Sequence, residues 1–198
     1  QLFVRQDNTD DALFYQAPRL VTHIDDATIA ALTQYYDEVL PEDSGVLDLM
    51  SSWISHLPAT KQFSRVAGLG MNQAELDANP RLDEKLVHNL NQQPALPWPD
   101  AWFDSVLIAV SVQYLVHPYE VFAEIARVLA PGGQVIVAMS HRCFPTKAIY
   151  AFHALSPDER MQLVGSYLDR ARLFEGIEAL DRSPAGADPL RIVRGVRR

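Results

Sequence analysis

Several polar side chains of this sequence stand where a buried strand is expected to end, and such positions can hold a ligand. Residues 46–49 form an apolar run typical of a buried parallel strand, with Asp48 near its end. Met50, Ser51 and Ser52 follow, and serine hydroxyls at a strand exit can satisfy free backbone N–H groups. Ligands of open α/β sheets bind outside the carboxyl ends of the strands. We therefore expect the carboxylate and the two serines to meet a polar ligand.

Three further predicted strands end at the same edge of the sheet. They span residues 65–70, 85–88 and 106–110, and a polar turn or a short helix follows each. The other residues expected at this edge are Gly70, Met71, Asn72, Asn89, Leu90, Val110 and Ser111.

Four more residues are candidates for contact with a ligand: Tyr15, Gln113, Tyr114 and His141. His141 follows a predicted strand over residues 134–139. For the two tyrosines, aromatic packing around the first helix is an equally good explanation. No catalytic residue can be named, although His141 and Tyr114 are candidates for a base if the chemistry needs one.

Helices and strands alternate along the chain, which predicts an α/β sheet with helices on both faces. A full crossover helix after the first strand is not expected, because Pro58 would break it. The last two expected strands span 173–180 and 190–196, and the expected helices span 26–40, 73–78, 120–129, 146–155 and 157–170.

Two long segments resemble a known family. Residues 96–110 read Leu-Pro-Trp-Pro-Asp-Ala-Trp-Phe-Asp-Ser-Val-Leu-Ile-Ala-Val, and residues 121–135 read Val-Phe-Ala-Glu-Ile-Ala-Arg-Val-Leu-Ala-Pro-Gly-Gly-Gln-Val. In this order and spacing they resemble class I S-adenosylmethionine (SAM) dependent methyltransferases, in the type 11 or UbiE-like small-molecule branch. Residues 51–58, Ser-Ser-Trp-Ile-Ser-His-Leu-Pro, are similar to the loop of a narrower bacterial and plant group of methyltransferase-like proteins.

The resemblance implies a Rossmann-like α/β fold with a seven-stranded, mostly parallel sheet, helices on both faces and an antiparallel last strand. We expect one domain over residues 1–198, in which residues 1–43 form an arm and a helix that cover the site. The implied cofactor is SAM, and the implied substrate is an unidentified small-molecule methyl acceptor.

The resemblance also assigns a part of the cofactor to each strand end. The methionine end would meet Asp48 and residues 50–52, the ribose residues 70–72, the adenine Asn89 and Leu90, and the sulfonium Val110 and Ser111.

The first of these loops departs from the family pattern, which is acidic-x-Gly-x-Gly-x-Gly. Asp48 supplies the acid, but Met50, Ser52 and Ile54 replace the three glycines. Because SAM has no phosphate, small serines can still meet its carboxylate, whereas an NAD-linked oxidoreductase would need the missing phosphate nest. Trp53 and Ile54 are expected to face the core.

A second departure is Gly70, which stands where an acidic residue commonly binds ribose hydroxyls. Asn72 or Glu75 could replace that acid, or both could merely cap and solvate the next helix.

The rival function is a catalytically degenerate methyltransferase-like protein that acts as a binding or assembly partner. The two departures favour it, and the intact segments 96–110 and 121–137 oppose it.

Composition disfavours several other classes. The formal net charge of −8 is poorly suited to a nucleic-acid backbone. The single cysteine, Cys143, allows no intrachain disulfide and has no recognisable activating base, and none of the six histidines has metal-ligand spacing. No apolar run could span a membrane and no signal-peptide pattern opens the chain. We expect a cytoplasmic protein without a bound metal, and a homodimer is compatible with the sequence.

Overall fold

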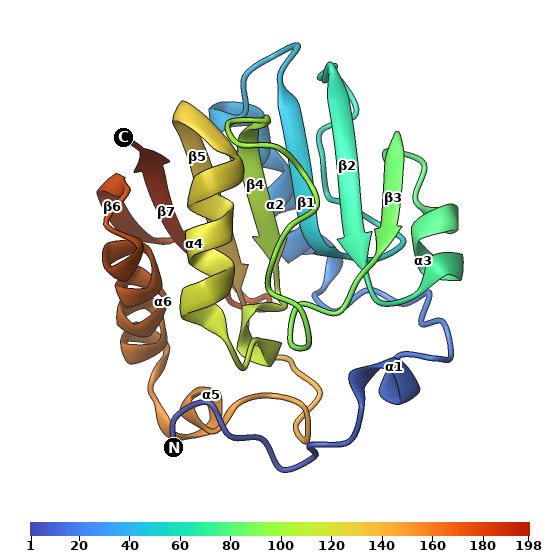
Figure 1. The fold of residues 1–198 in the computed structure, drawn as a ribbon, viewed down its shortest axis with the longest axis vertical. Coiled ribbons are helices and arrows are strands. Elements are labelled where there is room, and N and C mark those ends of the chain that lie inside the picture. Colours follow the sequence, from blue (N-terminus) through green and yellow to red (C-terminus); the bar gives the residue numbers. More distant parts are fainter.

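Seven strands form one sheet in the order β3-β2-β1-β4-β5-β7-β6 (Figure 1). The computed structural model describes residues 1–198. β1 to β5 are parallel, whereas β7 runs antiparallel to both β5 and β6. This arrangement confirms the predicted Rossmann-like sheet. The strands are β1 (Gly45–Ser51), β2 (Arg65–Gly70), β3 (Glu84–Val87), β4 (Phe103–Ala109), β5 (Leu129–Met139), β6 (Phe174–Asp181) and β7 (Arg191–Arg197).

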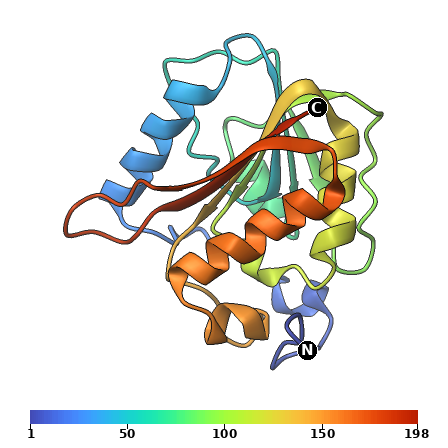
Figure 2. The same ribbon diagram turned by 90° about the vertical axis from the view of Figure 1, so that its left-hand side faces the viewer.

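Helices cover the two faces of the sheet unequally. α4, α5 and α6 share a hydrophobic cluster on one face, and α2 and α3 share another on the opposite face, as the positions of α2, α4 and α6 in Figure 2 illustrate. No helix forms between β1 and β2, in agreement with the presence of Pro58. The helices are α1 (Asp11–Phe14), α2 (Asp26–Val39), α3 (Gln73–Ala78), α4 (Pro118–Val128), α5 (Tyr150–Ala154) and α6 (Pro157–Ala171), and a 3-10 turn spans Val112–Tyr114.

Side chains of the central strands alternate between these two clusters, as the two-residue period of a strand requires. Along β1, Val46 packs with α2, whereas Leu47 and Leu49 pack with α4. Both sides are buried, so the strands are apolar throughout and the polar residues collect at their carboxyl ends.

α5 is shorter than the helix expected over residues 146–155, because tertiary contacts use the backbone groups of its first turn. The amide of Ile149 donates to the carbonyl of Gln113, and the amide of Tyr150 donates to the carbonyl of Val4. A helix beginning at residue 146 would break both hydrogen bonds. The local pattern predicted a helix here, and long-range pairing shortens it.

A buried lysine ties the N-terminal arm, residues 1–24, to the segment before α5. Lys147 is fully buried, and its ammonium lies 3.0 Å from Asp11 Oδ1 and 3.3 Å from Asp7 Oδ2. The same ammonium donates to the carbonyl of Thr9 at 2.8 Å. Arg5 completes the cluster with a 2.9 Å ion pair to Asp11. Because these charges leave water together, each depends on its partners.

Replacing Lys147 with methionine is therefore expected to loosen the arm. The variant Lys147→Met leaves the carboxyl of Asp11 and the carbonyl of Thr9 short of a donor, at a cost of about 3 kcal/mol in the free energy of unfolding. Urea unfolding measures the cost, and limited proteolysis within residues 1–24 reports release of the arm.

Lys85→Met is the matched control for this prediction. The Lys85 ammonium pairs with Asp77 at 3.6 Å near the surface, so its loss should cost under about 1 kcal/mol. Equal effects of the two substitutions would show that the buried cluster does not hold the arm.

Candidate functional site

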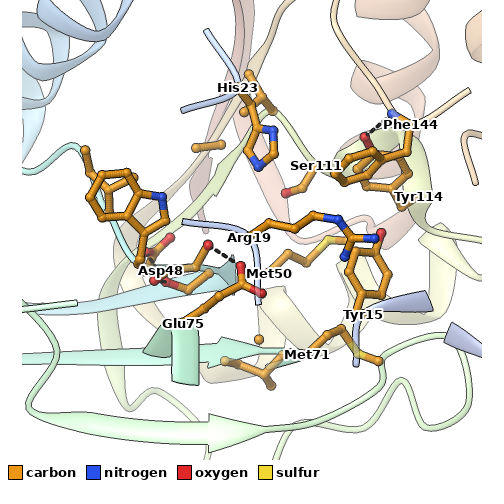
Figure 3. A pocket seen from close by; sticks show the side chains of 18 of the residues that line it. Tyr15, Arg19, His23, Asp48, Met50, Met71, Glu75, Ser111, Tyr114 and Phe144 are labelled. Carbon is orange, nitrogen blue, oxygen red and sulfur yellow. Dashed lines mark hydrogen bonds between the residues drawn. The ribbon is translucent and has the colours of Figure 1, made fainter. Parts of the chain in front are cut away.

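A cavity of about 250 Å³ opens at the carboxyl ends of β1, β2 and β4, beneath the arm (Figure 3). Strand ends form its floor, as expected for an open α/β sheet. The predicted residues that line it are Tyr15, Asp48, Met50, Ser51, Ser52, Gly70, Met71, Asn89, Leu90, Val110, Ser111 and Tyr114.

Asn72 is a predicted site residue that does not line the cavity. Its side-chain oxygen accepts from the amide of Glu75 and caps α3, and its amide nitrogen donates to the carbonyls of Tyr15 and Gln16. Both ends of the side chain are therefore occupied in holding α3 and the arm together.

Gln113 and His141 also lie outside the cavity lining. Gln113 is buried, and its side-chain nitrogen donates to the carbonyl of Val110 at the turn after β4. The His141 side chain is 55% exposed, and its Nε2 lies 3.7 Å from Asp188 Oδ1. Neither side chain is placed to meet a ligand within the cavity.

Asp48 is the buried acid at the centre of this site. Ser51 Oγ and Ser55 Oγ each donate to Asp48 Oδ2 at 2.6 Å, and Asn79 Nδ2 donates to Ser55 Oγ at 2.8 Å. Burial raises the pKa of Asp48 to about 6, although the serine hydrogen bonds act in the opposite direction. The carboxyl is thus poised to ionise near neutral pH, where a cationic ligand group would favour the ionised form.

The loop after β1 keeps a glycine-like backbone without glycine. Met50 has a φ of +59° and Val110, at the end of β4, a φ of +48°. This left-handed conformation costs an L-residue about 1 kcal/mol or more, and it is rare for a β-branched side chain. The backbone therefore bends at residue 50, where the family pattern has glycine, and the packed surroundings maintain the strain.

Gly70 has no side chain because β1 comes too close. The register of β1 against β2 shifts after Leu49, so that Ser51 pairs with Gly70. A Cβ atom on Gly70 would lie 2.4 Å from the backbone oxygen of Ser51. An acidic residue at the end of β2 is therefore sterically excluded in this chain.

Glu75 supplies an acid at the cavity wall from α3 instead. Glu75 is 8% exposed, and Ser52 Oγ donates a short hydrogen bond to its Oε1 (Figure 3). From the sequence, Asn72 or Glu75 could replace the missing acid, and mere capping and solvation of the helix was an equally good explanation of both residues. The geometry separates them, because Glu75 lines the cavity and Asn72 acts as the helix cap.

Trp53 and Ile54 face the cavity and not the core, contrary to the sequence-based expectation. Without a crossover helix, the chain after β1 runs along the mouth of the cavity. The indole Nε1 of Trp53 donates to the carbonyl of Val21 at 2.9 Å, which joins this loop to the arm. An indole N–H needs such a partner, and the arm provides it.

The arm closes the cavity from above, whereas α2 packs against the sheet. His23 of the arm lies near His56. Burial lowers the pKa of His23, and burial together with the nearby His23 lowers the pKa of His56 to about 4. Both imidazoles are therefore neutral at pH 7. The arm residues that line the cavity are Tyr15, Arg19, Val21, Thr22 and His23.

An aromatic group borders the cavity near the loop after β5. Tyr114 and Phe144 stack with ring centroids 5.8 Å apart, and the Tyr114 hydroxyl accepts from the amide of Phe144 at 2.8 Å. Burial raises the pKa of Tyr114 to about 12, so the hydroxyl stays protonated at neutral pH. It is therefore poorly suited to act as a base, and the exposed His141 is not among the residues that line the cavity.

Sequence reasoning missed several cavity residues. For Arg142, Cys143 and Phe144 a signal existed, because they follow a strand end. The arm was expected to cover the site, but apart from Tyr15 no signal singled out which of its side chains line the cavity, since their positions depend on contacts distant in sequence. The missed lining residues are Arg19, Val21, Thr22, His23, Trp53, Ile54, His56, Leu69, His88, Asn91, Ala109, Leu115, Arg142, Cys143 and Phe144.

No group of three or more His, Cys, Asp or Glu side chains in the chain is arranged to hold a metal ion. No helix reaches the length and apolarity that a bilayer crossing requires.

Comparison with known sequences finds similarity over the central part of the chain. Residues 51–137 match the family model described as a methyltransferase domain. The chain is 26% identical, over 121 residues, to the ubiquinone/menaquinone biosynthesis C-methyltransferase UbiE of Chromobacterium violaceum, covering 60% of this chain and 49% of that protein. The chain spans about half the length, or less, of the curated relatives it matches.

Solved structures share the fold. An S-adenosylmethionine dependent methyltransferase from Mesorhizobium loti superimposes with a TM-score of 0.57 at 17% identity, covering 86% of this chain and 100% of that chain. Geranyl diphosphate C-methyltransferase from Streptomyces coelicolor, in complex with Mg²⁺, geranyl diphosphate and S-adenosyl-L-homocysteine, gives 0.58 at 13% identity, covering 85% and 78%.

Strand order and matched domain together define the class: the chain has a class I methyltransferase fold, and the family resemblance in its sequence is confirmed. Within the class, the relatives named in the sequence comparison are UbiE proteins, in agreement with the predicted branch.

Gly70→Ala tests the steric origin of the missing acid. The added Cβ would collide with the backbone of Ser51, so we expect the free energy of unfolding to fall by about 2 kcal/mol or more. In the control Gly45→Ala, the nearest atom to the new Cβ is 3.5 Å away, and stability should barely change. Urea unfolding of both variants decides, and equal stabilities would contradict the close approach.

The raised pKa of Asp48 predicts a pH-dependent stability. The pKa of Asp48 is about 6 in the folded state, against an ordinary value of 3.8 that we take for the unfolded state. The folded state therefore keeps its proton at pH values where the unfolded state has lost it, and the stability that this proton contributes is complete below pH 3.8 and is lost as pH rises through about 6. The stability of the wild type relative to Asp48→Asn should therefore fall, by on the order of 3 kcal/mol, between about pH 4 and pH 8. Urea unfolding across this range measures it, and a flat difference would contradict burial of the acid.

Proposed function

We propose that this chain binds SAM in the cavity and transfers its methyl group to a small-molecule acceptor. The observation that carries the proposal is the convergence of β1, β2 and β4 on one cavity with two buried acids, Asp48 and Glu75, on its wall. The UbiE relative supports the same assignment. So do two fold neighbours, of which one contains bound S-adenosyl-L-homocysteine and the other is described as S-adenosylmethionine dependent.

The cavity has polar capacity that a ligand such as SAM would use. Ser111 Oγ and His56 Nδ1 are buried without a hydrogen-bond partner. Both residues line the cavity. A buried polar atom without a partner is costly, so a polar ligand would repay that cost on binding.

Asp48 is assigned to the methionine end of the cofactor. Its carboxylate would meet the ammonium group, and the carboxylate of the cofactor would lie against the backbone at Ser51 and Ser52, whose hydroxyls already donate to Asp48 and Glu75. Because a cation favours ionised Asp48, the affinity for SAM should rise as pH increases through about 6.

Glu75 is assigned to the ribose. Ser52 Oγ orients its carboxylate, and a carboxylate can accept from both hydroxyls of a diol. For the adenine, Met71 and Leu90 offer apolar faces. Asn89 Oδ1 accepts from the amide of Asn91 and keeps a second lone pair for the amino group.

When bound, SAM supplies a methyl group that its sulfonium already activates for transfer. The group would be transferred to a nucleophilic atom of the acceptor, with the bonding electron pair left on sulfur and the acceptor's proton passed to a base or to water. The protein's part is alignment and exclusion of water, which the closing arm and the floor at Val110 and Ser111 provide. His23, which burial keeps neutral at pH 7, lines the cavity and is one group that could take this proton.

The second candidate is a methyltransferase-like protein that has lost catalysis and serves as a binding or assembly partner. The residues at positions 50, 52 and 54 favour it, since the family's three glycines are absent there. Cofactor binding separates the two functions.

Isothermal titration of the purified chain with SAM and with S-adenosylhomocysteine is the direct test. We expect dissociation constants in the micromolar range, or about −8 kcal/mol. No binding at millimolar ligand, with the fold verified by circular dichroism, would reject the enzyme and leave the partner function.

Glu75→Gln tests the relocated acid. Loss of a charge-assisted hydrogen bond should weaken both ligands by roughly tenfold to a hundredfold. Asp77→Asn, an exposed acid of the same helix, is the matched control and should bind as the wild type does. An unchanged affinity of Glu75→Gln would remove Glu75 from the cofactor site.

A further inference from the structure

One guanidinium lies among aromatic rings at the end of the cavity away from Asp48. The Cζ atom of Arg19 is 4.6 Å from the ring centroid of Phe14, 5.1 Å from that of Phe144 and 5.6 Å from that of Tyr15. Figure 3 shows the Arg19 side chain reaching across the cavity toward Tyr15, with Asp48 on the other side. Cation–π contacts of this kind hold a guanidinium in place without neutralising it.

Arg19 also has a donor to spare. Its Nη2 donates to the carbonyl of Phe14 at 2.9 Å, whereas its Nη1 is buried without a partner. No Asp or Glu carboxylate lies within ion-pair distance of Arg19 anywhere in the chain. A shielded, unpaired guanidinium is costly, and an anionic ligand would supply the missing acceptor.

Charge is unequally distributed along the cavity. The two acids on its wall, Asp48 and Glu75, are joined by the serines of the loop after β1. The two arginines on its wall are Arg19 and Arg142, and Arg142 is already paired with Asp188 at 3.0 Å. One end of the cavity therefore favours a cation, and the Arg19 end favours an anion.

Flat side chains surround the Arg19 end. Phe144 and Tyr114 stack at an interplanar angle of 28°, and Tyr15 meets Phe144 edge-on at 6.3 Å. Aromatic faces of this kind favour a planar ligand. A cavity of about 250 Å³ is small for a ligand site, so an acceptor that shares it with a cofactor must itself be small.

We propose that the methyl acceptor is a small aromatic anion, whose carboxylate or comparable acid group pairs with Arg19 while its ring lies against Tyr15, Tyr114 and Phe144. The inference rests on the proposed function and names the substrate class for the same site. SAM itself carries a carboxylate, but Arg19 points away from Asp48, which is the residue assigned to the methionine end.

Titration of three matched one-ring probes tests the charge preference. Benzoate, benzamide and benzylamine are titrated into the chain by calorimetry, with and without saturating S-adenosylhomocysteine. We expect benzoate to bind roughly tenfold tighter than benzamide, and benzylamine to bind weakest. Equal binding of benzoate and benzamide, in either condition, would overturn the inference.

Variants of Arg19 then locate the preference. Arg19→Gln should weaken benzoate by roughly tenfold and leave S-adenosylhomocysteine within about twofold, whereas Arg19→Lys should keep the preference for benzoate. Arg170→Gln is the matched control, because the Arg170 guanidinium lies over Tyr119, outside the cavity, and all affinities should be retained.

The outcomes separate this inference from the function on which it rests. If Arg19→Gln weakens S-adenosylhomocysteine and not benzoate, Arg19 binds the cofactor's own carboxylate and the inference is wrong. If the wild type fails to bind S-adenosylhomocysteine, the proposed function is wrong, while the titrations without it still decide the preference for an aromatic anion.

Discussion

The close approach of β1 to β2 at the cavity sets what a ligand can meet there. The backbone oxygen of Ser51 occupies the space that a side chain at position 70 would need. The acid that the family pattern leads one to expect at the end of this strand is therefore sterically excluded in this chain, and Glu75 of α3 lies at the cavity wall. In the proposed function, Glu75 takes the role of that acid.

The same loop carries backbone strain that its surroundings maintain. Met50 adopts a left-handed conformation that would suit glycine. The hydrogen bonds from Ser51 and Ser55 to Asp48, and from Asn79 to Ser55, hold the loop around it. Strain of this kind persists only where many contacts determine the backbone, and it is common at ligand sites.

A buried ion cluster decides the other wall of the cavity. Lys147 holds the carboxylates of Asp7 and Asp11, and so places the arm that carries Tyr15, Arg19 and His23 over the strand ends. β1 provides Asp48, α3 provides Glu75, and the arm provides the unpaired guanidinium of Arg19. In the proposed function, the cofactor and the acceptor are therefore selected by two walls of the cavity that different contacts hold in place.

Much of the fold could be read from local patterns, because strand and helix signals act over a few residues. Apolar runs predicted β1 and β4, and the helix expected over residues 157–170 is α6, which begins with a capping box of Ser156 and Glu159. The rule that strand ends hold ligands found Asp48 and Ser111, and it could have found Phe144. The helix expected from residue 146 failed, because distant partners claim its backbone groups.

The sequence by itself determined the elements, their alternation and the polar residues at the strand ends. Only the tertiary structure decided that Glu75 and not Asn72 faces the cavity, that Trp53 turns outward to the arm, and that Arg19 stands unpaired among aromatic rings. The physical reason is that these outcomes depend on contacts between residues far apart in the chain. Such contacts leave no periodicity or spacing in the sequence from which they could be read.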